Sequence, residues 1–558
     1  MLLKVLRSLW ATLWVGRKPA SLPANTDSGL DVYVADGVVH HRAGALTKAE
    51  VAYRNALKRN PHNVNALHLL GILTYRRGDL DEAEILVRHA LLAHPGAHEI
   101  LNTLAGILTS MGRHAEAEGA LIQALHNTPD ALKARANLLF LLNIIPGVSR
   151  DRLLAEHVEW GNRHASGDFM ENNLNAWVDW QKFPDPERLR IGYVSADFCY
   201  HPVGRIISGI LRLHDRGVFE VFCYDNGSEK DEVNSTLRNY AEHWVEVEAM
   251  SDEVLAARIR SDRIQVLVDL SGHTRKHRLK VFGFKPAPVQ ATWLGYLNTT
   301  GIKAIDWRIT DSRADPPPVA QQWHVERLWY LPDCPWIWEA PSPPVPLVPE
   351  PPCVKNGYVT FGSFNTFRKI NDKVLVTWTR ILERIPNSRL RIHGAPRGKA
   401  VDRVYDLFEA NGIASSRIDL FSPIEYRRYL SAFGDIDISL DPFPYNGGAT
   451  TCESIWMGVP VVSLAGSGGF ARSGASILGA MHLSELVATS EDGYVDVAAG
   501  LARNQEGLAK MRWSLRDRFL SSPLSDSLGF TRNLEKAYKG MWENWERHNE
   551  ILRAANIH

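Results

Sequence analysis

A segment in the C-terminal half has the composition of a phosphate-binding turn. It reads Asp-Pro-Phe-Pro-Tyr-Asn-Gly-Gly-Ala-Thr-Thr-Cys-Glu over residues 441–453. We expect a strand to end at Asp441 and a helix to begin near residues 449–451. Glycines let the backbone approach a ligand closely, and the amides of a first helical turn attract phosphate. The segment therefore predicts a site for a phosphorylated ligand, contributed by Asn446, Gly447, Gly448, Ala449, Thr450 and Thr451.

Glu453 lies one turn into the expected helix, where a carboxylate would bridge the two hydroxyls of a ribose. The same residues also have a structural interpretation. In that alternative Thr450 caps the helix and Glu453 only complements the positive end of the helix dipole. The local sequence leaves both interpretations open.

A lysine follows the first strand expected in the same domain. The motif is Phe-Gly-Ser-Phe-Asn-Thr-Phe-Arg-Lys-Ile over residues 361–370. Lys369 would face the same cleft and neutralise a leaving diphosphate, whereas a lone lysine is usually a solvated surface residue. We expect the neighbouring Arg368 to point away.

Two further motifs follow expected strands of an earlier domain. In Gly-Tyr-Val-Ser-Ala-Asp-Phe-Cys-Tyr-His-Pro, residues 192–202, His201 precedes a proline that favours the first position of a helix. The imidazole is therefore expected at the helix mouth. Asp269 and His273 lie at the end of another strand. An isolated histidine is more often structural than catalytic, but two at strand ends of one sheet favour a shared cleft.

The elements that position these motifs alternate between short apolar strands and helices, the pattern of parallel sheets covered on both faces. The expected strands are Leu189–Val194, Glu220–Cys223, Val266–Leu270, Gln290–Leu294 and Trp307–Ile309, then Tyr358–Phe361, Arg389–Ile392, Ile418–Phe421, Asp437–Leu440 and Val459–Leu464. A proline-rich linker separates the two series. Two doubly wound domains of this kind present the carboxyl ends of their strands to a common cleft.

The N-terminal part contains an internal repeat. Pro61, Pro95 and Pro129 are each 34 residues apart, and small residues keep the same step, as in Ala83 and Ala117. Small residues let antiparallel helices approach, glycines make the turns and prolines end the second helix of each pair. Stacked repeats leave a concave face for a peptide. The alternative is a spacer that binds nothing.

The overall composition limits the function classes. Lys plus Arg and Asp plus Glu both number 63, so a nucleic-acid or anionic-membrane surface over the whole molecule is disfavoured. The five cysteines are scattered with no Cys-x-x-Cys pair, which suits a reducing cytosol and excludes a zinc ribbon. The apolar N-terminus is interrupted by charges and too short for a membrane span, so we expect an amphipathic helix packed on the repeats. The alternative is a weak interfacial anchor.

Together these residues are similar to the protein O-GlcNAc transferase family, in a bacterial form. The resemblance rests on the repeats, Gly-Tyr-Val-Ser-x-Asp-Phe-x-x-His-Pro, Gly-His-Thr, Pro-Ala-Pro-x-Gln-x-x-Trp-Leu-Gly-Tyr, Phe-Asn-x-x-x-Lys-Ile and Asn-Gly-x-x-Thr. It implies a GT-B fold, UDP-GlcNAc as donor, inversion at the anomeric carbon and serine or threonine acceptors.

The resemblance also implies roles for single residues. Lys369 would hold the diphosphate, Thr450 and the helix start the phosphates, and Glu453 the ribose. His201 would lie beside the donor and the acceptor hydroxyl. The remaining residues would line the same cleft or the UDP-sugar site: Asp269, His273, Thr366, Pro202 and Tyr296.

The predicted fold class is α plus α/β: an N-terminal tetratricopeptide superhelix followed by a GT-B fold of two doubly wound Rossmann-like domains. The predicted boundaries are 1–27 for the N-terminal helix, 28–147 for the repeats, 148–185 for a helical connector starting near Arg150, 186–340 for the first lobe, 341–353 for the linker and 354–558 for the nucleotide-binding lobe with a C-terminal helix.

The predicted reaction needs no cofactor and no metal, because the Asp-Ile-Asp of residues 435–437 reads as a helix end followed by a strand start. The general base stays open between His201 and a donor phosphate or water. Expected partners are a protein or peptide acceptor along the array and cleft and a UDP-sugar in the cytoplasm, without nucleic acid or stable membrane insertion. Two alternatives remain: another UDP-sugar or a non-protein acceptor, or a tetratricopeptide scaffold with a non-catalytic nucleotide-binding half.

Overall fold

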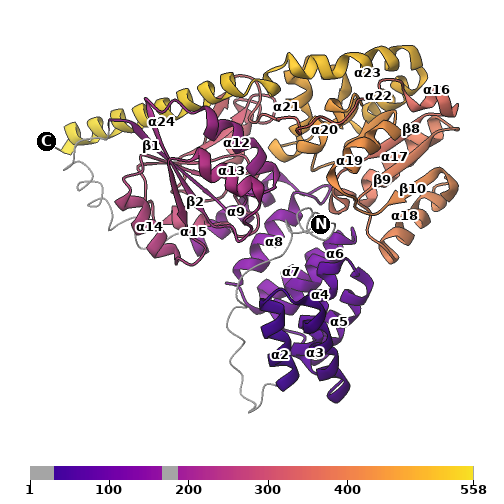
Figure 1. The fold of residues 1–558 in the computed structure, drawn as a ribbon, viewed down its shortest axis with the longest axis horizontal. Coiled ribbons are helices and arrows are strands. Elements are labelled where there is room, and N and C mark those ends of the chain that lie inside the picture. The colour runs from indigo at the N-terminus through magenta and orange to yellow at the C-terminus, as the bar shows by residue number, and fades with distance from the viewer. Residues whose placement is uncertain (1–30, 166–186, 557–558) are drawn as a thin grey trace. The chain divides into compact units, whose positions relative to one another are not determined.

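The computed structural model describes residues 31–165 and 187–556. The predicted N-terminal helix within 1–27 and the second part of the predicted connector lie outside the described residues. The chain divides into two compact units, whose elements are labelled in Figure 1. The first unit contains Met1–Ile145, Phe364–Thr379 and Arg391–Ile424, and the second contains Pro146–Ser363, Arg380–Leu390 and Glu425–His558.

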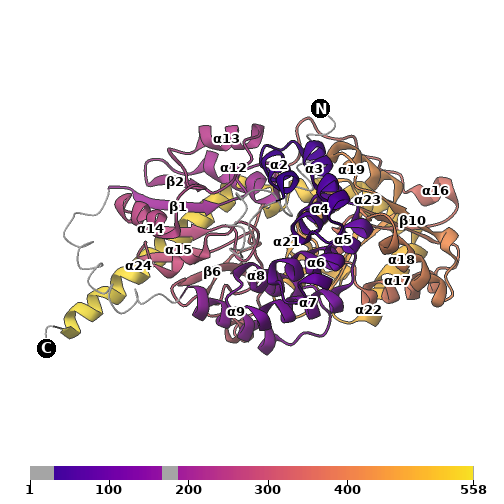
Figure 2. The ribbon, with the colours of Figure 1, turned by 90° about the horizontal axis from the view of Figure 1, so that it is seen from below.

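Antiparallel helix pairs form the N-terminal part of the first unit, stacked in chain order (Figure 2). The helices are α2 (Val32–Arg42), α3 (Leu46–Arg59), α4 (Val64–Arg77), α5 (Leu80–Ala93), α6 (His98–Ser110), α7 (His114–Asn127) and α8 (Leu132–Leu142).

The predicted reasons for this repeat are confirmed. Gly78 and Gly112 have φ angles of +90° and +78°, the left-handed conformation that ends a helix without steric cost in glycine. Each repeat proline lies two residues after a helix end. The alanines at the repeated positions are wholly buried between helices: Ala49, Ala56, Ala83, Ala90, Ala117 and Ala124.

The predicted connector begins with helix α9 (Arg150–His164), which belongs to the second unit. Ser149 caps it by accepting a hydrogen bond from the N–H of Arg152. Two glycines let it pack tightly, since a Cβ on Gly161 would collide with the backbone of Gly301.

The first sheet has seven parallel strands in the order β3-β2-β1-β4-β5-β6-β7. Ile191 of β1 pairs with Val221 on one side and with Val266 on the other. The strands are β1 (Leu189–Ser195), β2 (Phe219–Asp225), β3 (His243–Glu246), β4 (Val266–Asp269), β5 (Val289–Thr292), β6 (Trp307–Asp311) and β7 (Arg327–Leu331), accompanied by helices α12 (Pro202–Leu213), α13 (Glu232–Tyr240), α14 (Asp252–Ser261) and α15 (Leu279–Gly283).

The second sheet has six strands in the order β10-β9-β8-β11-β12-β13. The strands are β8 (Thr360–Ser363), β9 (Arg389–His393), β10 (Ile418–Phe421), β11 (Ile438–Leu440), β12 (Val461–Leu464) and β13 (Val487–Ala488). The helices are α16 (Pro352–Asn356), α17 (Asp372–Arg384), α18 (Lys399–Ala410), α19 (Tyr426–Ala432), α20 (Ala449–Trp456), α21 (Ser473–Ala480), α22 (Glu491–Arg503) and α23 (Gln505–Leu520).

The last helix, α24 (Ser527–Asn556), completes the core of the first sheet although it follows the second in sequence (Figure 1). Its buried residues are Phe530, Leu534, Ala537, Tyr538, Met541 and Trp542. Tyr193 of β1 and Tyr538 join their hydroxyls at 3.1 Å. The end of the predicted range 354–558 therefore contributes to the first lobe.

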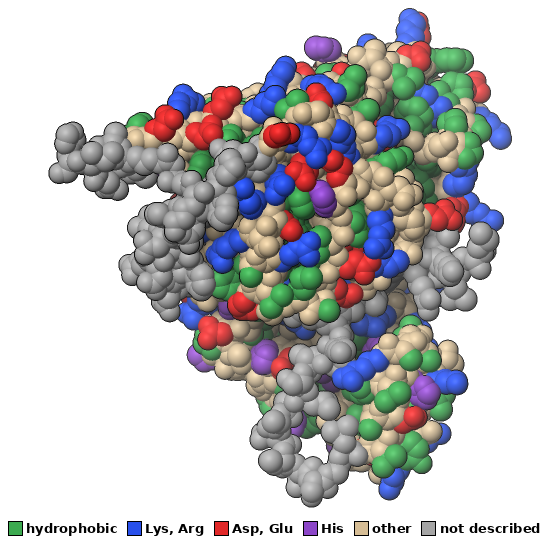
Figure 3. Space-filling model, turned by 60° about the vertical axis from the view of Figure 1, so that its left-hand side comes forward, with side chains coloured by type: hydrophobic (Ala, Val, Ile, Leu, Met, Phe, Trp, Pro, Cys, Tyr) green, Lys and Arg blue, Asp and Glu red, His purple; other side chains and the backbone are tan. Residues whose placement is uncertain are grey.

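Surface charge is mixed: Figure 3 shows acidic and basic side chains interspersed over the face in view. All five cysteines are buried and free. None of the described helices combines the length and the hydropathy needed to span a bilayer.

Candidate active site

The strand order reverses once in each sheet, and the predicted site residues follow the strands on either side of these reversals. The reversal lies between β1 and β4 in the first sheet and between β8 and β11 in the second. His201 follows β1 and Asp269 ends β4; Lys369 follows β8 and the glycine segment follows β11. In doubly wound sheets, ligands bind in the crevice at such a reversal.

The loop after β11 is held by its own polar residues. The carboxylate of Asp441 accepts hydrogen bonds from the N–H of Gly447 at 2.7 Å and from the hydroxyl of Ser463 at 2.8 Å. The N–H of Asn446 donates to the carbonyl of Phe470, while its side-chain amide donates to carbonyls of the loop and of β12. Asn446 thus shapes the loop in addition to any contact with a ligand.

Helix α20 begins at this loop with an open first turn. Its N-cap is Gly448, which provides no side-chain cap, so the alternative in which Thr450 caps the helix is wrong. A Cβ on Gly448 would meet no atom within 4 Å, which leaves space beside the helix start. The hydroxyl of Thr451 is buried without a partner among the described residues. Such a group calls for a water or a ligand atom.

Glu453 lies in a buried cluster one turn further along α20. Its two carboxylate oxygens accept hydrogen bonds from the hydroxyls of Tyr426 at 2.8 Å and Tyr429 at 2.9 Å. Burial raises its pKa, and the nearby guanidinium of Arg205 opposes that shift. Each oxygen keeps further acceptor capacity.

Arg205 connects the starts of α12 and α20. Its guanidinium lies 3.5 Å from Glu453 and donates to Tyr426 at 2.8 Å. Because Arg205 comes one turn after His201, the contact brings the helix mouth of the first lobe toward the start of α20. Sequence reasoning missed Arg205, Tyr426 and Tyr429. The only sequence signal was the one-turn spacing of Arg205 from His201.

His201 is the N-cap of α12, as predicted from the following proline, and Pro202 is the first, exposed helical residue. The Nδ1 atom of His201 accepts the N–H of Val203 at 3.3 Å and lies 3.9 Å from the carboxylate of Asp197. This hydrogen bond assigns the proton of the neutral ring to Nε2. In this tautomer Nε2 is a hydrogen-bond donor.

Asp269 lies in the interior of the first lobe. Its carboxylate accepts hydrogen bonds from the N–H groups of Ser271 at 3.1 Å and Gly272 at 2.8 Å, and from the Thr292 hydroxyl at 2.8 Å. Burial raises its pKa to about 6 despite these hydrogen bonds. The geometry is that of a residue that stabilises the turn after β4.

His273 and Tyr296 are also buried, in a cluster against α9. The Nε2 of His273 donates to the carbonyl of Thr300 at 2.8 Å, and burial lowers its pKa well below the usual value. The hydroxyl of Tyr296 donates to Nε2 of His157 at 2.7 Å, because Nδ1 of that ring donates to a backbone carbonyl. These residues support the loops at the strand-order reversal of the first sheet. That reversal is called the first switch point, and the reversal in the second sheet is called the second switch point.

Lys369 ends a short 3-10 turn, η2 (Phe367–Lys369), in the first unit. Thr366 is exposed at the start of this turn, and Lys369 is half-buried. The guanidinium of Arg368 lies 4.5 Å from the ring of Phe140 in α8. Arg368 therefore packs on the repeats.

The Asp-x-Asp sequence occupies the predicted place, with Asp435 ending a 3-10 turn and Asp437 preceding β11. The two oxygens of Asp437 accept backbone N–H groups from Cys353 at 3.0 Å and Thr360 at 2.7 Å. Asp437 is thus engaged in holding the chain together.

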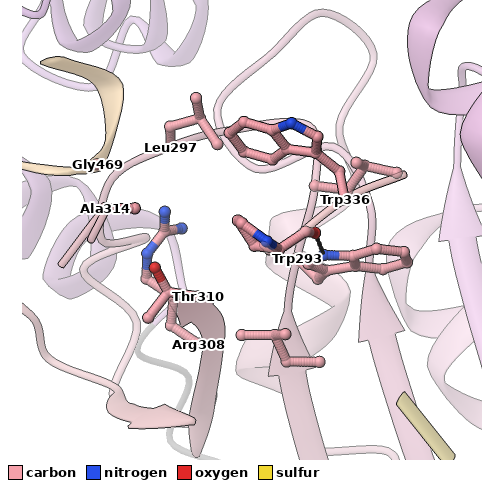
Figure 4. Close-up of a pocket in the computed structure, with 10 residues that line it drawn as sticks. Trp293, Leu297, Arg308, Thr310, Ala314, Trp336 and Gly469 are labelled. Carbon is pink, nitrogen blue, oxygen red and sulfur yellow. Dashed lines mark hydrogen bonds between the residues drawn. The ribbon is translucent and has the colours of Figure 1, made fainter. Parts of the chain in front are cut away.

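The second unit also contains a small pocket (Figure 4). Inside it Trp293 donates from its indole N–H to the carbonyl of Pro335 at 2.6 Å. Its lining consists of Trp293, Leu294, Leu297, Arg308, Ile309, Thr310, Ala314, Pro335, Trp336 and Gly469. None of the predicted nucleotide-binding residues is among them.

Two Rossmann-like sheets with polar loops at both switch points, preceded by helical repeats, define a protein of the GT-B glycosyltransferase class. The family model described as "Glycosyl transferase family 41" matches residues 175–340 and 353–534, and the model described as "Tetratricopeptide repeat" matches residues 40–99. The chain belongs to glycosyl transferase family 41.

Two relatives whose names state an activity extend this result. The chain is 40% identical over 425 residues to "Probable UDP-N-acetylglucosamine--peptide N-acetylglucosaminyltransferase SPINDLY" of Petunia hybrida, covering 75% of this chain and 45% of the relative. It is 32% identical over 368 residues to the Arabidopsis thaliana protein of the same description named SEC, covering 64% of this chain and 37% of that one. The chain thus spans less than half the length of these relatives.

A solved structure covers almost the whole chain. It is a lysine-to-methionine mutant of the O-GlcNAc transferase of Thermobaculum terrenum, 33% identical, with a TM-score of 0.85. The match covers 93% of this chain and 98% of that one. This likeness confirms the predicted combination of helical repeats and two Rossmann-like domains.

Proposed function

We propose that this chain transfers N-acetylglucosamine from UDP-GlcNAc to serine or threonine hydroxyls of proteins, with inversion at the anomeric carbon. The observation that carries the proposal is the placement of polar loops after all four strands that flank the two switch points. The donor is the one named for the relatives in Petunia hybrida and Arabidopsis thaliana.

In the proposed reaction an acceptor oxygen forms a bond to the anomeric carbon while the bond from that carbon to the β-phosphate oxygen breaks. The electron pair of the broken bond stays with UDP, and the hydroxyl proton passes to a base. Negative charge therefore grows on the diphosphate. The ammonium of Lys369 and the first-turn amides of α20 supply positive potential for that charge.

We propose that His201 holds the donor through Nε2. The hydrogen bond from Val203 to Nδ1 leaves Nε2–H as the group available to a phosphate or sugar oxygen. In this tautomer Nε2 carries no lone pair for the acceptor proton, so a donor phosphate or a water takes that proton.

We further propose that no metal takes part. The backbone contacts of Asp437 support this, because the acid that would complete an Asp-x-Asp site is already engaged. Activity that survives EDTA is the expected result. Loss of activity with EDTA and its recovery with Mn²⁺ would contradict the proposal.

The acceptor is proposed to lie along the repeats, whose stacked helices offer an extended surface for a peptide. A cytoplasmic location fits the five buried free cysteines, which would remain reduced there.

The test is a donor panel of UDP- and GDP-linked sugars with a peptide library, read by mass spectrometry. Addition of N-acetylhexosamine from UDP-GlcNAc alone supports the proposal, and a preference for another donor would replace it. Calorimetry with UDP, read together with the transfer assay, tests the scaffold alternative. Binding of UDP without transfer from any donor would favour a scaffold with a non-catalytic nucleotide-binding half, and absence of UDP binding would contradict the nucleotide site itself.

A further inference from the structure

The peptide group that joins Arg368 to Lys369 is held at both ends. Its carbonyl oxygen accepts a hydrogen bond from Nε2 of His114 at 2.8 Å, and its N–H donates to the carbonyl of Thr366 at 2.9 Å. Because a peptide group is planar, these two bonds orient the peptide plane that leads into Lys369. The second bond belongs to the turn itself. The first comes from the repeats, 254 positions earlier in the chain.

His114 is suited to this role. It is the first residue of α7 and is buried. Burial lowers its pKa to about 4, so near neutral pH the ring is uncharged and donates from Nε2 to the carbonyl. No charge is buried to make this contact.

Other parts of the repeats contact the same turn. The guanidinium of Arg368 lies over the ring of Phe140. The side-chain amide of Asn371 donates to the carbonyl of Ile144 at 3.5 Å. A Cβ on Gly112 would meet the backbone of this segment at 3.3 Å. The lysine turn is thus seated on α7, α8 and the loop between α6 and α7, within one compact unit.

We propose that the repeat array positions Lys369 for the nucleotide, with His114 as the positioning residue. The inference rests on the proposed function, because it takes Lys369 as the group that grips the diphosphate. A shift of the turn would move the ammonium away from the growing charge, and such misplacements are costly in catalysis. The array then serves the donor as well as the acceptor.

The competing explanation is that His114 only stabilises the packing of the turn on the repeats. A matched control separates the two. His68 of α4 is also a partly buried array histidine with a pKa lowered to about 4, and its Nε2 pairs with the hydroxyl of Thr103 at 2.9 Å. Its partner is another repeat residue and not the lysine turn.

The experiment uses the full chain with His114→Ala, His114→Gln and His68→Ala. The measurements are UDP affinity by calorimetry, kcat for transfer and the thermal midpoint. Both alanine variants should lose similar stability, whereas only His114→Ala should weaken UDP binding and lower kcat, each by about tenfold. His114→Gln should restore both, because its amide nitrogen reaches the same carbonyl.

Phe140→Leu is a second variant, which removes the ring under Arg368 while keeping an apolar side chain. It should weaken UDP binding in the same direction by a smaller factor. Lys369→Met shows how much UDP affinity and kcat are lost when the ammonium itself is removed. If it weakens UDP binding while His114→Ala and Phe140→Leu bind UDP as His68→Ala does, the positioning role is wrong and the proposed grip stands. If Lys369→Met binds UDP and turns over normally, the proposed grip itself is wrong.

Discussion

The two switch points have the same topology but differ in what their polar residues are engaged with. At the first, the buried carboxylate of Asp269 accepts hydrogen bonds from two backbone N–H groups and a hydroxyl, and His273 is buried against α9. At the second, the start of α20 has no side-chain cap, and Thr451 keeps a buried hydroxyl without a partner among the described residues.

This difference shows that a polar residue does not have to contact a ligand just because it lies at the carboxyl end of a strand beside a switch point. A buried polar group with hydrogen-bond partners in the chain can be structural, whereas one without a partner among the described residues calls for a water or a ligand atom. In the first lobe only the His201 turn keeps a partly exposed polar side chain among the predicted residues after β1 and β4. We therefore expect changes at the first switch point, apart from His201, to affect stability, and changes at the second to affect the nucleotide.

The largest expected effect is on catalysis. Lys369→Met should lower the transfer rate by roughly 100- to 1,000-fold, because the leaving charge loses its ammonium, while the thermal midpoint barely changes. Initial rates with UDP-GlcNAc and a peptide acceptor measure it. Lys373→Met, an exposed lysine on α17, is the matched control and should keep near-normal activity. Equal transfer rates for the two variants would contradict the proposed contact between the Lys369 ammonium and the leaving diphosphate.

The next effect is on folding. Asp269→Ala removes the acceptor of three buried donors and should cost about 2–4 kcal/mol in the free energy of unfolding. Chemical denaturation measures it. UDP affinity of the folded fraction should stay within about twofold of the parent. An unchanged stability with lost UDP binding would make Asp269 a ligand residue instead.

Acid should weaken the first switch point. Burial lowers the pKa of His157 to about 4 and that of His273 well below its usual value, so unfolding takes up two protons as pH falls below 6.5. Asp269, with its pKa raised to about 6, opposes this by one proton between pH 6 and 4. The net uptake of about one proton by these three groups lowers stability as pH falls through that window, and His68 and His114, whose pKa values are also lowered to about 4, act in the same direction. Thermal midpoints from pH 7 to 5 measure it, and a rising midpoint would refute it.

The smallest expected effects come from a pair of threonines. Thr451→Val replaces an unpartnered hydroxyl, so it should leave stability unchanged and weaken UDP binding about two- to tenfold. Thr292→Val removes the donor to Asp269 and should do the reverse, costing about 1 kcal/mol of stability with unchanged UDP affinity. Calorimetry measures the UDP affinity of both variants, and chemical denaturation measures their stability. If both variants affect the same property, the contrast between the switch points is wrong.

Much of the fold could be predicted because it depends on local pattern. The ten expected strands are present. The central ones, such as β1, β4 and β11, have apolar runs that are buried over most of their length. The sequence reasoning missed β3, β7 and β13, which lie at sheet edges or are only two residues long. β3 is only half-buried, so its sequence, His-Trp-Val-Glu, lacks a continuous apolar run.

For the candidate site, the sequence indicates where the loops lie but not which side chains contact one another. Lys369 and the glycine segment follow strand ends, which is a sequence signal. The cluster around Glu453 depends on Arg205, which is 248 positions away, and on two tyrosines of α19. One of the hydrogen bonds to the Asp269 carboxylate likewise comes from Thr292, which lies on a different strand. Only the folded chain brings such groups together.

Helix α24 has a consequence for the order in which the protein is made. The core beneath β1 and β4 needs side chains from the last thirty-residue helix, so the first lobe stays unfinished until synthesis has passed through the whole second lobe. A ribosome that stops before Ser527 would release a chain whose earlier lobe, and not its later one, exposes apolar surface to chaperones and proteases.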